Sequence, residues 1–144
     1  GYREGTRELI VRRGVRIGID VGKARVGVAR SDIDGLMAVP SETLARESAL
    51  AALVALSAES SVLEWVIGLP LSLDGGETLS TADARSFARE RLSTVGAQAA
   101  LHSASHTTKS SRSVIDQVAA TILLDTALVA ERRGTMLGET LEAA

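Results

Sequence analysis

Hydrophobic and polar positions in the first third of the chain predict three short strands. Residues 16–21 and 26–30 are β-branched apolar runs separated by a Gly-Lys-Ala turn, and residues 36–39 form a third run that Pro40 should stop. The Asp-Ile-Asp-Gly sequence at 32–35 is a hairpin turn signal. Because short turns join antiparallel neighbours, we predict an antiparallel three-strand meander.

The pattern then alternates between helical periods and one short strand that is apolar on both faces. Residues 49–56 have helical spacing, and residues 65–69 form an apolar run that Pro70 should end, typical of a buried parallel strand behind a crossover helix. A loop with an Asp74-Gly75-Gly76 turn follows. Beyond it we predict a helix opened by a capping box of Ser80 and Asp83 and running through Phe87, a helix over 93–101, a polar loop over 103–111 and a long helix over 113–131.

This order of elements is typical of an α/β fold with a mixed sheet, in which a meander and parallel strands are flanked by helices. Residues 15–133 are expected to form one domain. Residues 1–14 are polar and are expected to form a flexible leader, and residues 134–144 a flexible tail.

The amino-acid composition excludes several kinds of site and indicates where charge is concentrated. The chain has no cysteine, which excludes disulfides and zinc–thiolate sites, and no apolar run long enough to cross a bilayer, so we expect a cytoplasmic protein without a membrane partner. The first 30 residues hold eight basic and three acidic side chains, so this part carries a net charge of +5 although the chain carries −2. Such a basic edge could steer a polyanion, or could be an ordinary solvated leader.

Three acidic residues are candidates for chemistry. Asp20 lies in an apolar strand before a glycine, where a buried carboxylate needs a pairing partner or a metal. Asp116 lies at the edge of the apolar face of the last predicted helix, although a first-turn acid is also favoured by the helix dipole alone. Glu90 by itself reads as a solvated helix-surface residue. His102 and His106 are expected to be exposed in the polar loop.

Four short motifs appear in one order over residues 15–130. They are Gly18-Ile19-Asp20-Val21-Gly22 with Arg25-Val26-Gly27-Val28-Ala29, Ile67-Gly68-Leu69-Pro70 with Asp74-Gly75, Glu90-Arg91-Leu92-Ser93-Thr94, and Val114-Ile115-Asp116-Gln117-Val118-Ala119-Ala120. With them the chain resembles the YqgF family of Holliday-junction-resolvase-like proteins. The resemblance implies a ribonuclease H-like fold and a nuclease that processes the ends of pre-16S ribosomal RNA in ribosome biogenesis.

The resemblance also implies which residues form the catalytic site. Asp20, Glu90 and Asp116 would form an acidic cluster that binds Mg²⁺ or Mn²⁺, with two ions for phosphodiester hydrolysis. Asp20 would bridge the ions, and the other two acids would flank it. Lys23, Arg25 and Arg112 are candidates to contact phosphates. With this resemblance we expect structured RNA as the partner in preference to branched DNA. Because aromatic side chains for base stacking are scarce, recognition of the nucleic-acid backbone and shape is more plausible than stacking on bases. Nothing in the sequence indicates the oligomeric state.

The chain departs from the family pattern before Glu90. Arg89 stands where the family has an aspartate, and the strand expected before this motif, about 15 residues with its turn, is absent; the link near Glu47 is also short. Either residues are missing from the sequence there or this member lacks a strand, and we expect the former, because losing a strand would displace Glu90.

Other functions remain open alongside an RNA nuclease. A Holliday-junction or DNA resolvase-like nuclease would use the same acids, and a non-catalytic RNA- or protein-binding module would use the same fold without them. The Asp-x-Gly hairpin also occurs in sugar-kinase and actin-like ATPases, but these are much longer than 144 residues. Metal binding would distinguish a nuclease from a pure binding module.

Overall fold

A mixed sheet of six strands forms the centre of the part of the chain that the structure describes. The computed structural model describes residues 12–92, 98–105, 113–134 and 139–141. The strands are β1 (Arg16–Val21), β2 (Arg25–Ser31), β3 (Ala38–Ala45), β4 (Glu64–Leu71), β5 (Gln98–Ser105) and β6 (Glu139–Leu141), and the helices are η1 (Arg46–Ser48), α2 (Ala49–Ser60), α3 (Leu79–Arg91) and α4 (Ser113–Arg132). The predicted meander over β1, β2 and β3 is therefore confirmed.

The strand order is β3-β2-β1-β4-β5-β6. Strand β1 pairs antiparallel with β2 and parallel with β4, which is parallel to β5. The two parallel connections run through α2 and α3, because parallel neighbours need a long crossover. This arrangement confirms the predicted α/β mixed sheet flanked by helices.

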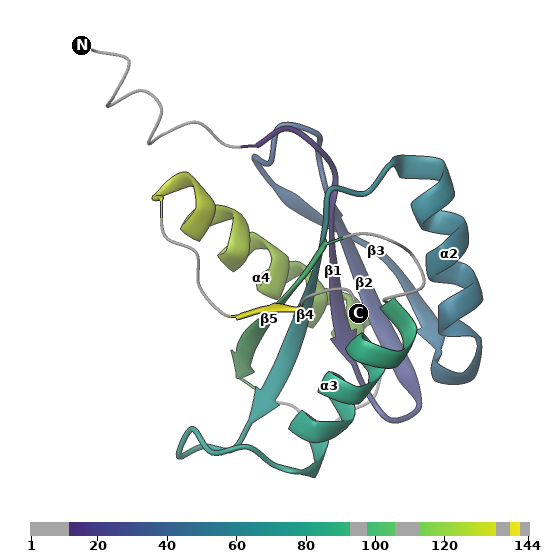
Figure 1. Cartoon of the computed structure of the whole chain (residues 1–144), viewed down its shortest axis with the longest axis vertical. Helices are drawn as coiled ribbons and strands as arrows, with labels where there is room; N and C mark the ends of the chain where they lie inside the picture. The colour runs from purple at the N-terminus through teal and green to yellow at the C-terminus, as the bar shows by residue number, and fades with distance from the viewer. Residues whose placement is uncertain (1–11, 93–97, 106–112, 135–138, 142–144) are drawn as a thin grey trace.

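Helices cover both faces of the sheet (Figure 1). On one face, α2 and α3 pack against alternate residues of β1 and β4, with Ile19, Trp65 and Phe87 in one buried cluster. On the other face, α4 packs Ala120 and Leu124 into a second buried cluster. Because side chains alternate along a strand, neighbouring residues of β1 face different helices.

Two strands continue through prolines that were expected to end them. Strand β3 lies at the edge of the sheet, and its register with β2 shifts between Val28 and Ala29, where Ala29 pairs with Pro40. An edge position and an irregularity both tolerate a residue without an N–H. Strand β4 continues past Pro70 to Leu71, beyond its last pair with β1.

The start of α3 also differs from the prediction. Thr78, not Ser80, is the N-cap, and the capping box pairs Thr78 with Thr81 rather than Ser80 with Asp83. Thr81 also donates its hydroxyl to the Pro70 carbonyl, which links the helix start to the end of β4. This contact joins residues 11 positions apart, which the local capping pattern does not indicate.

The segment 93–105 is the largest error of the sequence prediction. Its described part, Gln98–Ser105, is strand β5, although the alanine-rich sequence suggested a helix over 93–101 and a loop from 103 onward. Pairing along the whole of β4 overrides that local propensity. His102 is consequently buried, not exposed, and burial lowers its pKa. His106 lies outside the described residues.

The two chain ends also contain ordered residues. Strand β6 falls in the segment predicted as a flexible tail and pairs antiparallel with β5. Arg12, in the predicted flexible leader, donates hydrogen bonds to Glu131 and Glu64. Residues 1–11 lie outside the described part. None of the helices in the described ranges is long and apolar enough to cross a membrane.

Candidate functional site

Asp20 lies near the carboxyl end of β1, where open α/β sheets place their ligands. Its side chain is half-buried and points toward the face covered by α4. This orientation follows from Gly18, two residues earlier on the same face, where an added Cβ would lie 2.8 Å from the Ala120 carbonyl oxygen of α4. The residues on either side, Ile19 and Val21, belong to the core on the opposite face.

Asp116 meets Asp20 across Gly27. In the β1–β2 ladder Asp20 pairs directly with Gly27, so the two residues share a face. A Cβ added to Gly27 would lie 3.0 Å from the Asp116 Cβ. Because directly opposite Cβ positions are about 4.5–5.5 Å apart, the Asp20 and Asp116 Cβ atoms are no more than about 8.5 Å apart. Two of the three predicted acids therefore converge.

Glycine at position 27 allows this approach. The first turn of α4 lies so close to β2 that an added Cβ would be 2.1 Å from the Asp116 carbonyl oxygen, closer than real contacts permit. The glycine pattern was visible in the sequence, but the close helix that requires it was not.

Arg25 pairs with Asp116 at the rim of the site. Its Nε donates to Asp116 Oδ2 at 3.1 Å, and both side chains remain partly exposed. Lys23, in the turn between β1 and β2, is exposed. Arg112, the third predicted phosphate contact, lies outside the described residues.

The turn that carries Lys23 is held by Arg46, a residue that the sequence analysis missed. Arg46 donates from its backbone N–H to the Ala24 carbonyl at 2.9 Å and from Nη1 to the Gly22 carbonyl at 2.9 Å. Its guanidinium also forms two hydrogen bonds to Asp83 of α3, and these lower the pKa of the Asp83 carboxyl. No sequence signal connects Arg46 with this turn, because the contact depends on the path of β3.

Glu90 does not join the two aspartates. It lies near the end of α3, which packs on the sheet face opposite α4. Its side chain is exposed and accepts a hydrogen bond from Ser86 Oγ at 2.8 Å. The family motif at 90–94 begins at the end of a helix and continues into residues outside the described part, because α3 and not a strand leads directly into Glu90.

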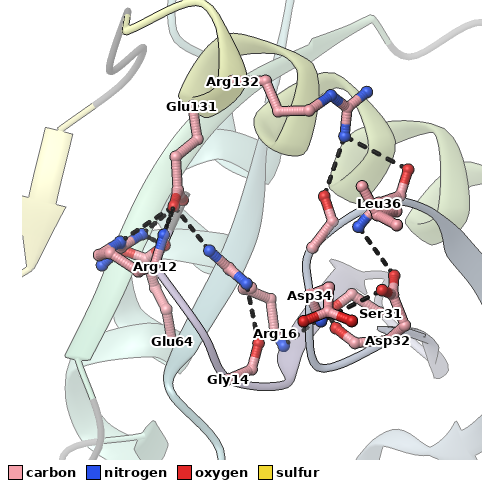
Figure 2. Close-up of polar contacts among 11 residues, drawn as sticks. Arg12, Gly14, Arg16, Ser31, Asp32, Asp34, Leu36, Glu64, Glu131 and Arg132 are labelled. Carbon is pink, nitrogen blue, oxygen red and sulfur yellow. Dashed lines mark hydrogen bonds and ion pairs between the residues drawn. The ribbon is translucent and has the colours of Figure 1, made fainter. Parts of the chain in front are cut away.

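A second charged cluster lies at the other end of the interface between α4 and the sheet (Figure 2). Arg16, at the start of β1, is 1% exposed and donates to Glu131 Oε2 at 2.6 Å. Arg12 donates to the same glutamate and to Glu64. Figure 2 shows both guanidinium groups pointing toward Glu131. This cluster consists of paired charges and anchors the far end of α4, so we assign it a structural role.

The donor set at Asp20 and Asp116 suits one hard divalent cation. Mg²⁺ is commonly held by one or two carboxylates, with water and substrate oxygens completing its coordination. Among the residues described, no group of three or more histidine, cysteine or acidic side chains could hold a metal ion. The two-ion arrangement expected from three acids is therefore not formed by this part of the chain.

Comparisons with known proteins identify the family. Residues 14–90 match the family described as RuvX, Holliday junction resolvase. A relative from Leifsonia xyli subsp. xyli named "Putative pre-16S rRNA nuclease" is 47% identical over 139 residues, covering 85% of this chain and 90% of the relative. A relative of the same name from Streptomyces coelicolor is 42% identical over 151 residues, covering 92% of this chain and 90% of that protein.

A solved structure supports the fold independently of sequence identity. The structure titled "T. thermophilus RuvC in complex with Holliday junction substrate" has a TM-score of 0.58 at 14% identity and matches 88% of this chain and 99% of its own. At this identity the likeness shows the fold alone, which is the predicted ribonuclease H-like type. The sequence relatives carry the family assignment, and the chain therefore belongs to the RuvX family of Holliday junction resolvases.

Proposed function

We propose that this protein is a nuclease that hydrolyses phosphodiester bonds of structured nucleic acid with the help of a divalent cation, and that it processes the ends of pre-16S ribosomal RNA. The observation that carries the proposal is the convergence of Asp20 and Asp116 over Gly27, at the carboxyl end of β1. The names of the sequence relatives support the RNA substrate. Such work would place the protein in the cytoplasm.

Each residue has a distinct part in this proposal. Asp20 and Asp116 hold a single Mg²⁺ or Mn²⁺ through their carboxylates. When bound, the cation would polarise a phosphoryl oxygen of the substrate and lower the pKa of a water molecule at the site. Arg25 places a guanidinium beside Asp116, where it orients the phosphate that is to be cleaved. Lys23, exposed in the turn between β1 and β2, is a further candidate to contact the nucleic-acid backbone. Glu90 has no part in the proposal, because it lies on the other face of the sheet.

In this proposal the protein recognises the sugar-phosphate backbone of the nucleic acid and does not stack side chains on its bases. The chain has one Trp, one Tyr and one Phe, and both Trp65 and Phe87 are buried in the core beneath α3. The described residues offer no accessible aromatic ring at the site. Such a site recognises phosphates and the shape of the nucleic acid, which suits folded RNA. A branched DNA would offer similar groups, and the experiment below includes it.

The test measures Mn²⁺-dependent cleavage of a precursor ribosomal RNA fragment and of a four-way DNA junction. We expect cleavage of the RNA, and a loss of at least about 100-fold in both the Asp20→Asn and the Asp116→Asn variants. Glu90→Gln should cleave at the parent rate. Asp125→Asn is the matched control, since Asp125 is an exposed aspartate of α4.

Three outcomes would overturn parts of the proposal. Wild-type cleavage rates in Asp20→Asn would remove the proposed site. Cleavage of the junction alone would replace RNA with branched DNA as the substrate. A folded parent protein that binds the RNA but cleaves neither substrate would show a binding module instead.

A further inference from the structure

The Arg25 guanidinium is bound to the Asp116 carboxylate, which the proposed function requires as a metal ligand. The pair uses one hydrogen bond, from Nε to Oδ2, and the Arg25 side chain is 35% exposed. Within the described residues, the Nη1 and Nη2 atoms of the Arg25 guanidinium make no hydrogen bond. The guanidinium is therefore bound at one side only and can turn to another anion.

Arg25 and Asp116 are positioned by rigid elements, so a change of partner requires only side-chain movement. Arg25 begins β2 and accepts a hydrogen bond from the Gly22 N–H at its carbonyl. Asp116 is in the first turn of α4, which Gly27 and Gly18 hold against the sheet. The flexible part of the pair is the arginine side chain.

A divalent cation and the Arg25 guanidinium compete for Asp116. Two positive groups beside one carboxylate repel each other, so a cation that binds Asp116 favours release of Arg25. The released guanidinium lies at the rim of the site, where a nucleic-acid phosphate can accept two parallel hydrogen bonds from it. Arginine suits this exchange because it stays charged and matches both carboxylate and phosphate geometry.

We propose that Arg25 couples metal binding to nucleic-acid binding: it is the counter-ion of Asp116 in the metal-free protein and transfers to a substrate phosphate when a divalent cation takes its place. The inference rests on the proposed function, because it requires Asp116 to be a metal ligand. Coupling of this kind is reciprocal, so the cation strengthens RNA binding by the same factor by which RNA strengthens cation binding.

The first experiment measures Mn²⁺ binding alone by isothermal titration calorimetry, without nucleic acid. In Arg25→Gln the competing cation is gone, and Mn²⁺ should bind about fivefold more tightly, the upper end of what a partly exposed ion pair is worth. Arg25→Lys keeps the charge and should stay near the parent affinity. The matched control is Arg30→Gln on the same strand, because Arg30 bonds Ser60 on the opposite side of the sheet.

The second experiment measures binding of a nuclease-resistant 2′-O-methyl RNA hairpin by fluorescence anisotropy, with and without Mn²⁺. Without Mn²⁺, Arg25→Gln should bind the hairpin like the parent, because Arg25 is then held by Asp116. With Mn²⁺ the variant should bind it more weakly than the parent. Lys23→Ala, which removes an exposed cation of the neighbouring turn, should instead weaken binding by the same factor in both conditions.

The outcomes separate this inference from the function on which it rests. If Asp116→Asn weakens Mn²⁺ binding but Arg25→Gln leaves it unchanged or weaker, the exchange is wrong and the metal site stands. Equal weakening of hairpin binding by Arg25→Gln with and without Mn²⁺ would also overturn the exchange. If Asp116→Asn does not alter Mn²⁺ binding at all, the proposed metal site fails, and the exchange fails with it.

Discussion

Replacing Gly27 by alanine should disturb the site without replacing any acidic residue. The added Cβ would lie 2.1 Å from the Asp116 carbonyl oxygen and 2.5 Å from its carbonyl carbon, and both are backbone atoms that cannot rotate away. Since real Cβ contacts are essentially never shorter than 3.0 Å, the first turn of α4 must move by at least about 0.9 Å relative to β2. Asp116 would move with it.

This displacement has two expected consequences. Overpacking should lower the free energy of unfolding by about 1–3 kcal/mol, although alanine by itself is more favourable than glycine within a strand. A misplacement of about 1 Å at a catalytic group costs about 100-fold in rate, so cleavage should fall by about that factor. Urea denaturation measures the first effect, and the RNA cleavage assay the second.

Gly76→Ala is the matched control. An added Cβ there would meet side-chain atoms, the nearest being Asp74 Oδ1 at 3.2 Å, in an exposed loop. Its unfolding free energy should change by no more than about 0.5 kcal/mol. If Gly27→Ala unfolds at the parent urea midpoint with an unchanged slope, the contact between α4 and β2 does not position Asp116, and the reasoning is refuted.

Three further changes test other contacts of the fold. Glu131→Gln should lower the unfolding free energy, measured in urea, by about 3–5 kcal/mol, because the buried Arg16 guanidinium loses its carboxylate. Thr78→Ala should lower the urea midpoint by an amount equivalent to about 1 kcal/mol, because α3 loses its N-cap. The hydrogen bonds from Arg46 lower the pKa of Asp83, so this pair stabilises the fold at neutral pH and loses its effect as pH falls below about 4. The stability difference between the parent and Asp83→Asn should shrink over that range.

Each of these expectations has its own contrary result. Glu77→Gln removes a carboxylate from an exposed pair with Arg85 and should cost about 1 kcal/mol or less, so an equal cost for Glu131→Gln would refute the importance of burial. Thr78→Ser should restore most of the cap, and a loss as large as that of alanine would exclude capping as the cause. A difference between the parent and Asp83→Asn that is independent of pH would exclude the ion pair.

Only part of the candidate site could be predicted from the sequence, and Glu90 shows why. Asp20 was identifiable because a carboxylate in an apolar strand needs a special reason. Asp116 was a candidate from its place beside the apolar face of a long helix, and the family resemblance grouped it with Asp20. Glu90 matches a family motif in sequence, but in this chain the motif follows a helix and not a strand. A motif places its residue in a site only when the element that carries it keeps its position in the sheet.

The charged contacts lay beyond the reach of sequence patterns. Arg25 and Asp116 are 91 residues apart, and Arg16 and Glu131 are 115 apart. Nothing in local periodicity pairs such residues, because ion pairs depend on where helix ends meet strand ends. The same limit applies to Arg46, whose contacts with Gly22 and Asp83 depend on the path of β3 and the placement of α3.

The sequence by itself determined the elements whose hydrophobic period is strong: the meander, strand β4, helix α2 and the long helix α4. Local spacing suffices there, because each element buries a face that its own residues define. Only the tertiary structure decided that Gln98–Ser105 is a strand, because pairing with β4 outweighs a weak helical preference. Only the tertiary structure brought Asp20 and Asp116 together, because Gly27 lets a distant helix pack directly on the strand.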